Sequence, residues 1–160
     1  MTTNATRIDL GANTRQKMCD LLNARLADAI DLAGQAKQAH WNVKGLNFAA
    51  LHTLFDQLHA NVTAHVDVIA ERIVALGGVA DGTVQGVAAA TTLPAYPKDI
   101  RAGRDHLDRM SISFATFGKA AREAIDTAED AGDAVTADLF TAIAAAADKD
   151  LWMLDAHLEP

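Results

Sequence analysis

Four side chains of types that commonly bind metal ions recur along residues 47–76: His52, Asp56, Asp67 and Glu71. If this segment is a helix, with about 100° between successive residues, all four fall within about 100° of arc. The apolar side chains fall on a different arc, so the four ligand types point away from the core. A mixture of imidazole and carboxylate suits iron, and also zinc or manganese.

A single chain cannot close a metal site with this arc alone. Asp56 and Asp67 are eleven residues apart, which is roughly 16 Å along a helix axis. Metal ligands must converge within a few ångströms, so the arc divides into two half-sites. His52 with Asp56 forms one half-site, and Asp67 with Glu71 forms the other; each is an i, i+4 pair.

A second copy of the helix, packed antiparallel about a two-fold axis near Asn61, would complete both half-sites. His52 would then face Glu71 of the partner subunit, and Asp56 would face Asp67 of the partner subunit. Small side chains on the same face would permit close approach. The spacing therefore predicts a metal site shared between two subunits. The plainer alternative is an acidic helix face that is simply solvated.

The elements that carry these residues are predicted to be helices. Apolar residues recur with helical spacing in four long segments, 14–43, 47–76, 99–131 and 133–157. The connection between the second and third segments is long, and residues 83–90 within it are predicted to form a short helix. Short first and third connections with one long middle crossover are typical of a ferritin-like four-helix bundle. We therefore predict an all-α, ferritin-like four-helix bundle whose long middle crossover carries a short helix.

Composition agrees with a single helical domain over residues 1–160, of which residues 1–13 are expected to form a short flexible tail. Hydrophobic residues make up 50% of the chain but aromatic residues only 5%, so Ala and Leu, which are good helix formers, supply most of the apolar mass. The single cysteine, Cys19, excludes an intrachain disulfide. The N-terminal segment has no apolar run typical of a signal peptide, and no stretch is long enough for a membrane span. A cytoplasmic protein is expected.

Several motifs together resemble one known family. The sequences KQAHWNVKG, FAALHTLFD and HVDVIAERIVALGG, followed by YPKDI, TADLF and DKDLWML, are similar to those of the Dps family, the miniferritins that protect DNA during starvation. The resemblance covers about residues 15–158. It implies a hollow shell of twelve subunits that oxidises Fe(II), preferably with hydrogen peroxide, and stores the ferric mineral. By this resemblance the ferroxidase ligands are His40, His52 and Asp56 of one subunit with Asp67 and Glu71 of its two-fold partner.

The resemblance also implies roles for residues around the site. Trp41 is a candidate for intercepting stray oxidising equivalents, with packing at a subunit interface as the alternative. The family is similar to ferritins in having acidic iron pores at a three-fold axis, for which Asp130, Asp133 and Asp138 are candidates. Asp138, in the TADLF motif, is the best match. The plainer alternative for each aspartate is a solvated helix cap, and Asp133 is already explained as the N-cap of the last helix.

Direct DNA binding is not favoured by the charge of the chain. The net charge is −7, with 21 acidic and 14 basic residues, and such a chain repels phosphate. The short N-terminal tail also lacks a lysine-rich run. The alternative function is nevertheless a nucleoid-coating protein whose metal site is mainly structural, and a third is a zinc or manganese scavenger. His65 is expected to pack at the core edge, while His106 and His157 are expected at the surface.

Overall fold

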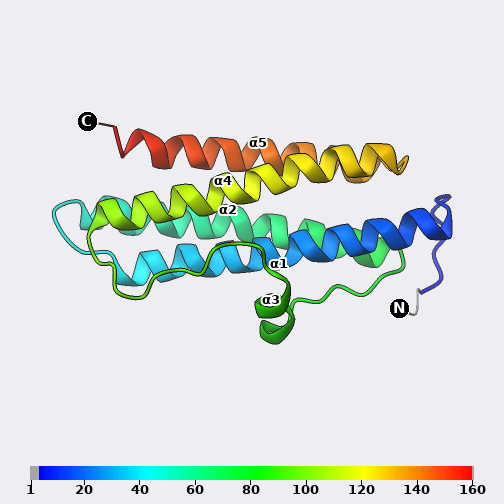
Figure 1. Ribbon diagram of the computed structural model, residues 1–160, viewed down its shortest axis with the longest axis horizontal. Coiled ribbons are helices and arrows are strands. Elements are labelled where there is room, and N and C mark those ends of the chain that lie inside the picture. Colours follow the sequence, from blue (N-terminus) through cyan, green and yellow to red (C-terminus); the bar gives the residue numbers. More distant parts are fainter. Residues whose placement is uncertain (1–3, 160) are drawn as a thin grey trace.

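The structure is a computed structural model that describes residues 4–159. It is built from helices, as the sequence predicted, and the helix bounds are α1 Ala12–Asn42, α2 Phe48–Ala75, α3 Val84–Ala90, α4 Gly103–Asp130 and α5 Ala134–Ala156. Figure 1 shows four long helices lying along the long axis of the molecule, with the short α3 outside the bundle beside α1. The predicted ferritin-like class is confirmed, including the short helix in the long crossover.

The bundle consists of two helical hairpins. α1 packs mainly against α2, and α4 packs mainly against α5, while the crossover containing α3 joins the two hairpins. No helix in the described part of the chain has the unbroken apolar length that a bilayer span requires.

A glycine follows the C-terminal end of α2, where the crossover begins, and another follows the end of α4, in the turn to α5. Gly77 after α2 and Gly132 after α4 adopt positive φ angles of 88° and 78°, which a residue with a Cβ atom adopts only at a cost. The backbone N–H of Gly78 donates to the carbonyl of Ile73, and that of Asp133 donates to the carbonyl of Ala128. These bonds satisfy the last carbonyls of each helix, so α2 and α4 end at defined residues.

The predicted apolar stripe of α2 forms part of the core. Its buried residues are Leu51, Leu54, Phe55, Leu58, Val62, Ile69 and Ile73. Burial of each such side chain contributes about 1.5–3 kcal/mol, which fixes the rotation of the helix about its axis. The opposite face is therefore held outward, and Asp56, Asp67 and Glu71 are exposed on it.

The crossover is tied to the bundle by polar side chains. The buried carboxylate of Asp28 on α1 accepts hydrogen bonds from the backbone N–H of Thr92 (2.7 Å) and from its hydroxyl (3.0 Å). Gln35 donates to the carbonyl of Pro94 (3.2 Å) and accepts from the hydroxyl of Ser113 on α4 (2.7 Å). Residues 91–96 consequently lie along α1 in a fixed register.

The N-terminal segment differs from the expected flexible tail over the residues that the structure describes. The backbone N–H of Asn4 donates to the carbonyl of Gly77 (2.7 Å), and the hydroxyl of Thr6 donates to that of Ala75 (3.0 Å). Ile8 and Leu10 pack against the core. The segment is anchored because it satisfies carbonyls at the end of α2, a contact that sequence periodicity could not show. Residues 1–3 of the predicted tail lie outside the described residues.

Candidate metal site

His40 and His52 form a reciprocal pair where α1 and α2 approach the end of their hairpin. The two imidazole rings stack with centroids 3.6 Å apart and an interplanar angle of 21°. Nδ1 of His40 lies 2.7 Å from the backbone carbonyl oxygen of His52, and Nδ1 of His52 lies 2.8 Å from that of His40. Each helix therefore fixes the side chain of the other.

The chemistry of these bonds sets the tautomer of both rings. A carbonyl oxygen can only accept a hydrogen bond, so each Nδ1 atom must carry the proton and donate it. In the neutral imidazole, Nε2 then keeps its lone pair. Metal-binding histidines in proteins are commonly oriented in this way by a backbone carbonyl. The two imidazoles could therefore bind a metal ion through Nε2, and one of them, His40, is a residue that helix spacing alone could not place.

Asp56 lies one helical turn after His52 and carries an ion pair that the sequence analysis did not predict. Its Oδ1 atom pairs with Nζ of Lys37 on α1. The hydrogen bond from Lys37 lowers the pKa of Asp56, and the nearby His40 and His59 lower it further. The signal for Lys37 was present in the sequence, since it precedes His40 by three residues and so shares its helix face.

A third imidazole, that of His59 on α2, also contacts a backbone carbonyl of α1. Nδ1 of His59 lies 3.0 Å from the carbonyl oxygen of Ala33 on α1, which is the same arrangement as in His40 and His52. His59 was not predicted to have a role. Its position one turn beyond Asp56 follows from the i, i+3 spacing on α2.

Asp67 and Glu71 remain apart from the histidine pair. Both are exposed on α2, toward its C-terminal end. Within residues 4–159 of one chain, no three His, Cys, Asp or Glu side chains come close enough together to hold a metal ion. The structure therefore brings His40, His52 and Asp56 near one another, while Asp67 and Glu71 lie elsewhere on α2.

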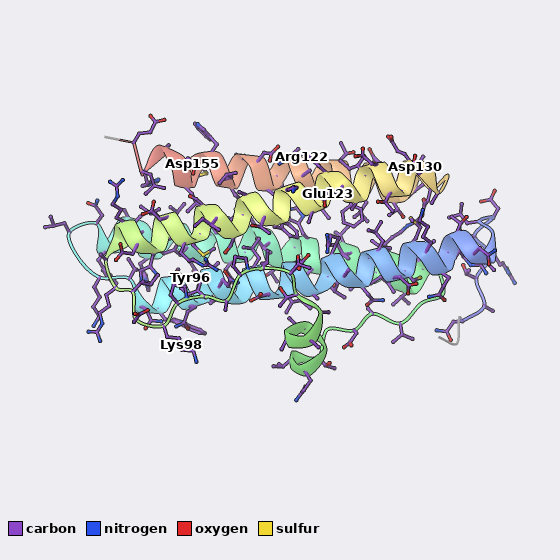
Figure 2. All side chains as sticks on the ribbon, viewed as in Figure 1. Tyr96, Lys98, Arg122, Glu123, Asp130 and Asp155 are labelled. Carbon is purple, nitrogen blue, oxygen red and sulfur yellow. The ribbon has the colours of Figure 1, made fainter. Side chains whose placement is uncertain are left out.

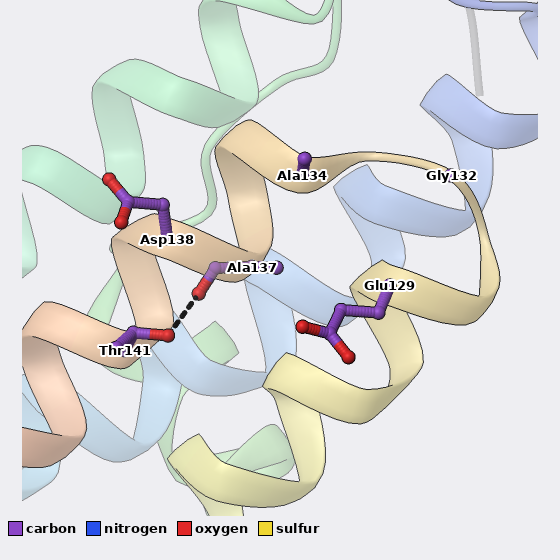
Figure 3. Close-up of a pocket in the computed structure, with 6 residues that line it drawn as sticks. All are labelled: Glu129, Gly132, Ala134, Ala137, Asp138 and Thr141. Carbon is purple, nitrogen blue, oxygen red and sulfur yellow. Dashed lines mark hydrogen bonds between the residues drawn. The ribbon is translucent and has the colours of Figure 1, made fainter.

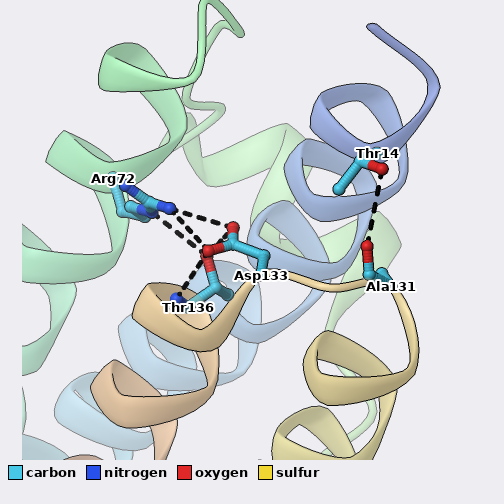
Figure 4. A network of polar contacts seen from close by, with 5 residues as sticks. All are labelled: Thr14, Arg72, Ala131, Asp133 and Thr136. Atoms are coloured by element: carbon cyan, nitrogen blue, oxygen red, sulfur yellow. Dashed lines mark hydrogen bonds and ion pairs between the residues drawn. The ribbon is translucent and has the colours of Figure 1, made fainter. Parts of the chain in front are cut away.

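The end of α2 next to Glu71 is held by a buried ion pair (Figure 4). Nη2 of Arg72 donates to both carboxylate oxygens of Asp133, at 2.8 and 2.9 Å, and Nε donates to the hydroxyl of Thr136 at 3.0 Å. Asp133 also accepts from the backbone N–H of Thr136, as the predicted N-cap of α5. Burial raises the pKa of Asp133, but the hydrogen bonds from Thr136 and Arg72 outweigh it and the net pKa is lowered.

The three aspartates proposed for the iron pore differ in their exposure to solvent. Asp133 is only 2% exposed and fully engaged, so its carboxylate does not face solvent. Asp130 and Asp138 are exposed. Asp138 lines a cavity of ≈ 420 Å³ where α4 turns into α5, together with Glu129, which the sequence analysis did not single out. Figure 3 shows Glu129 on α4 and Asp138 on α5 among the lining residues of this cavity.

Trp41 and the histidines outside the candidate site differ in their exposure to solvent. Trp41 is 67% exposed at the end of α1, beside the histidine pair. His65 is half-buried and His157 is exposed, as expected. The expectation for His106 was wrong: it is only 1% exposed, because Tyr96 of the crossover covers it and hydrogen-bonds to it.

Known proteins resemble the whole chain. A model of the Ferritin-like domain family matches residues 19–160. The DNA protection during starvation protein of Agrobacterium fabrum is 45% identical over 159 residues, which covers 99% of this chain and 98% of that protein. The protein of the same name from Brevibacillus brevis is 34% identical over 148 residues, covering 91% and 97%.

Solved structures agree with these relatives. DpsC from Streptomyces coelicolor superimposes with a TM-score of 0.95 at 29% identity, covering 99% of this chain and 93% of that one. The Dps protein of Vibrio cholerae O1 superimposes with a TM-score of 0.90 at 26% identity, covering 99% and 100%, and is described as a member of a broad superfamily of ferritin-like diiron-carboxylate proteins. The chain therefore belongs to the Dps family of ferritin-like proteins.

Proposed function

We propose that the protein is a ferroxidase and iron store, which oxidises Fe(II) at sites shared between subunits and retains the ferric product in a hollow shell. The observation that carries this proposal is the reciprocal pair of His40 and His52. Two imidazoles with fixed tautomers and free Nε2 atoms, beside the carboxylate of Asp56, form half of an iron site.

The second half of the site comes from a two-fold partner. Asp67 and Glu71 of the partner subunit would meet His52 and Asp56 in the antiparallel arrangement that their spacing predicts. Large apolar side chains that are exposed at both ends of α2 and in the residues just before it support burial of this region in an assembly, since exposed apolar surface commonly marks a contact surface. They are Trp41, Leu46, Phe48 and Val74. The shell of twelve subunits expected from the family resemblance would contain such an interface for every pair.

Iron is the substrate of this reaction, and hydrogen peroxide is the proposed oxidant. Two Fe(II) ions each give one electron, and one peroxide with two protons becomes two waters. Pairing the two electrons at one site avoids release of hydroxyl radical. A set of five protein ligands for two metal ions leaves positions open for the oxidant. The same imidazole and carboxylate ligands would also accept zinc or manganese.

Lys37 occupies the carboxylate of Asp56 while no metal ion is bound. Its ammonium group holds Asp56 ionised and neutralises part of the negative charge before iron arrives. An arriving Fe(II) ion, with charge +2, replaces the ammonium group of Lys37, with charge +1, on the carboxylate of Asp56. The charge next to Asp56 therefore changes by one unit rather than two. Exposed carboxylates at the turn between α4 and α5, Asp130, Asp138 and Glu129, are proposed to attract Fe(II) to an inlet pore.

DNA protection would follow from removal of iron and peroxide and needs no contact with DNA. The alternative, a nucleoid-coating protein with a structural metal site, has less support. The net charge of −7 opposes binding to phosphate, and Asn4 and Thr6 hold the N-terminal segment against α2. A gel-shift at low salt tests this alternative, since a coating protein would retard DNA there.

The ferroxidase proposal is tested by mixing the Fe(II)-loaded, oxygen-free protein with peroxide and following ferric absorbance and peroxide loss. We expect fast oxidation with two Fe(II) consumed per peroxide, lost when Asp56→Ala and Glu71→Ala are combined. The matched control combines Asp126→Ala and Asp155→Ala, which remove two exposed carboxylates elsewhere and should leave the rate unchanged. Equal rates in wild type, the double variant and protein-free buffer would exclude the site as a ferroxidase.

A further inference from the structure

The buried pair of Tyr96 and His106 has no part in the function proposed above. The hydroxyl of Tyr96 lies 2.7 Å from Nδ1 of His106. Tyr96 is half-buried on the crossover, and Figure 2 shows it between α4 and the end of α1. His106 lies on the first turns of α4 and is almost completely buried. Tyr96 is also the single tyrosine of the chain.

The second nitrogen of His106 is unusual. Nε2 is buried and makes no well-formed hydrogen bond. Buried polar atoms are seldom left without a partner, and each exception calls for a physical explanation. The backbone of Asn42 approaches the ring and favours its protonated form. The contact between His106 and the backbone of Asn42 therefore stabilises the ring more when it is protonated than when it is neutral.

The resting pair is neutral. Burial lowers the pKa of His106, against the opposing effects of Asp105 and the Asn42 backbone. Burial also raises the pKa of Tyr96, against the effect of Arg109. The phenol therefore keeps its proton. It donates this proton in a hydrogen bond to the Nδ1 lone pair, which leaves Nε2–H on the side of Asn42.

The pair lies close to both segments that carry the histidine ligands. The rings of His106 and Phe55 have centroids 6.1 Å apart, and Phe55 immediately precedes Asp56 on α2. Asn42, which approaches His106, follows His40 by two residues on α1. Arg109 holds the crossover in place by donating to the carbonyl of Ala95 at 3.0 Å. Through His106, Tyr96 is thus connected to the segments of α1 and α2 that carry His40 and Asp56.

We propose that Tyr96 and His106 form a one-electron relay that supplies the second electron when peroxide meets a site holding a single Fe(II) ion. The inference rests on the proposed ferroxidase function. One Fe(II) reduces peroxide to hydroxide and a hydroxyl radical. An electron from Tyr96 reduces that radical to a second hydroxide, and the phenol proton passes to Nδ1 of His106. The products are a neutral tyrosyl radical and an imidazolium.

A second Fe(II) ion then resets the pair. Its electron reduces the tyrosyl radical while His106 returns the proton to the phenolate oxygen, so both side chains regain their resting state. The sum is two Fe(II) and one peroxide converted to two Fe(III) and two hydroxides. The hydrogen-bonded imidazole matters because a phenol that loses an electron must also lose its proton, and Nδ1 is the acceptor already in place.

The test is electron paramagnetic resonance of the assembled protein, loaded with less than one Fe(II) per site and frozen after addition of peroxide. We expect a tyrosyl signal in wild type and none in Tyr96→Phe. In Tyr96→Phe, a spin trap should capture several-fold more hydroxyl radical than in wild type. Trp152→Phe, which changes an aromatic residue on α5 that is 66% exposed, is the matched control and should keep the tyrosyl signal.

His106→Gln separates proton transfer from packing. The glutamine oxygen can accept the hydrogen bond from Tyr96 but cannot take the proton, so the tyrosyl yield should fall by about tenfold or more while the melting temperature stays near that of wild type. An unchanged yield in this variant would overturn the relay. Iron oxidation with no tyrosyl signal in wild type would also overturn it, while leaving the ferroxidase proposal intact.

Photogenerated ruthenium(III) trisbipyridine, used without iron, tests the pair if the ferroxidase proposal itself fails. A tyrosyl absorbance that forms in wild type and falls in His106→Gln would support Tyr96 and His106 as a proton-coupled electron donor. Equal tyrosyl yields in the two proteins would overturn it.

Discussion

Lys37 on α1 forms an ion pair with Asp56 on α2, so one carboxylate of the candidate iron site already holds a cation supplied by the protein. The contact lies outside any single helix and joins the two helices that carry the histidine pair. It links the occupancy of the metal site to the position of a lysine side chain.

Replacement of this lysine should strengthen metal binding. In Lys37→Met the side chain keeps its length but no longer competes for Asp56 or repels an arriving cation. We expect the Kd for Zn(II), used as a redox-inert probe, to fall by roughly tenfold. Isothermal titration calorimetry measures this change. Lys119→Met, which removes a surface ion pair with Glu123 on α4, should leave Kd unchanged; weaker binding in Lys37→Met would show that Lys37 orients Asp56 instead.

Mixed assembly tests whether the site is shared between subunits. Subunits carrying Asp56→Ala and subunits carrying Glu71→Ala should each be inactive alone. In a mixed pair, one site loses both carboxylates while the other has neither change, because each site takes Asp56 from one subunit and Glu71 from the other. Random pairing should therefore restore about one quarter of the wild-type sites.

The measurement for mixed assembly is peroxide-dependent Fe(II) oxidation after the two variants are unfolded and refolded together. Refolding each variant separately and then combining the products is the control. If co-refolding restores no activity although mixed shells form, the ligands belong to sites within single chains.

The turn between α4 and α5 should control iron uptake by electrostatics. In the double variant Glu129→Gln and Asp138→Asn, two negative charges leave the cavity at this turn. We expect Fe(II) uptake to slow several-fold and to depend less on ionic strength, because attraction to a charged pore is screened by salt. Stopped-flow oxidation at low and high salt measures both effects. Asp155→Asn changes an exposed carboxylate at the opposite end of the bundle from Asp130 (Figure 2) and should have no effect.

The ion pair between Arg72 and Asp133 should stabilise the fold. Asp133→Asn leaves Arg72 half-buried without a counter-ion, and we expect the free energy of unfolding at pH 7 to fall by about 3 kcal/mol. Denaturant unfolding followed by circular dichroism measures this loss. Asp138→Asn is the control, because Asp138 is exposed and should change stability little.

The same ion pair predicts a pH dependence with a defined sign. The folded pKa of Asp133 is below the ordinary value of 3.8, so its stabilisation is fully present above that pH. The stabilisation is lost as the pH falls below 3.8 and through the folded pKa, where the native carboxylate becomes protonated. The stability difference between wild type and Asp133→Asn should therefore shrink in strong acid. A difference that grows in acid would contradict the assignment.

The sequence by itself determined the helices and the outward face of α2. Both depend on local periodicity: Leu51, Phe55 and Leu58 recur at helical spacing, and their burial forces Asp56, Asp67 and Glu71 to the opposite side. The short helix of the crossover and the capping role of Asp133 were also readable, because a cap involves residues only three apart.

Only the tertiary structure decided how residues of different elements meet. The crossed hydrogen bonds of His40 and His52, the pairing of Lys37 with Asp56, and the burial of His106 under Tyr96 each depend on the register between two separate segments. Helical spacing defines directions around one axis but not the distance or offset to the next axis. The packing of the core sets that offset, and it turned an expected surface histidine into the buried partner of the only tyrosine.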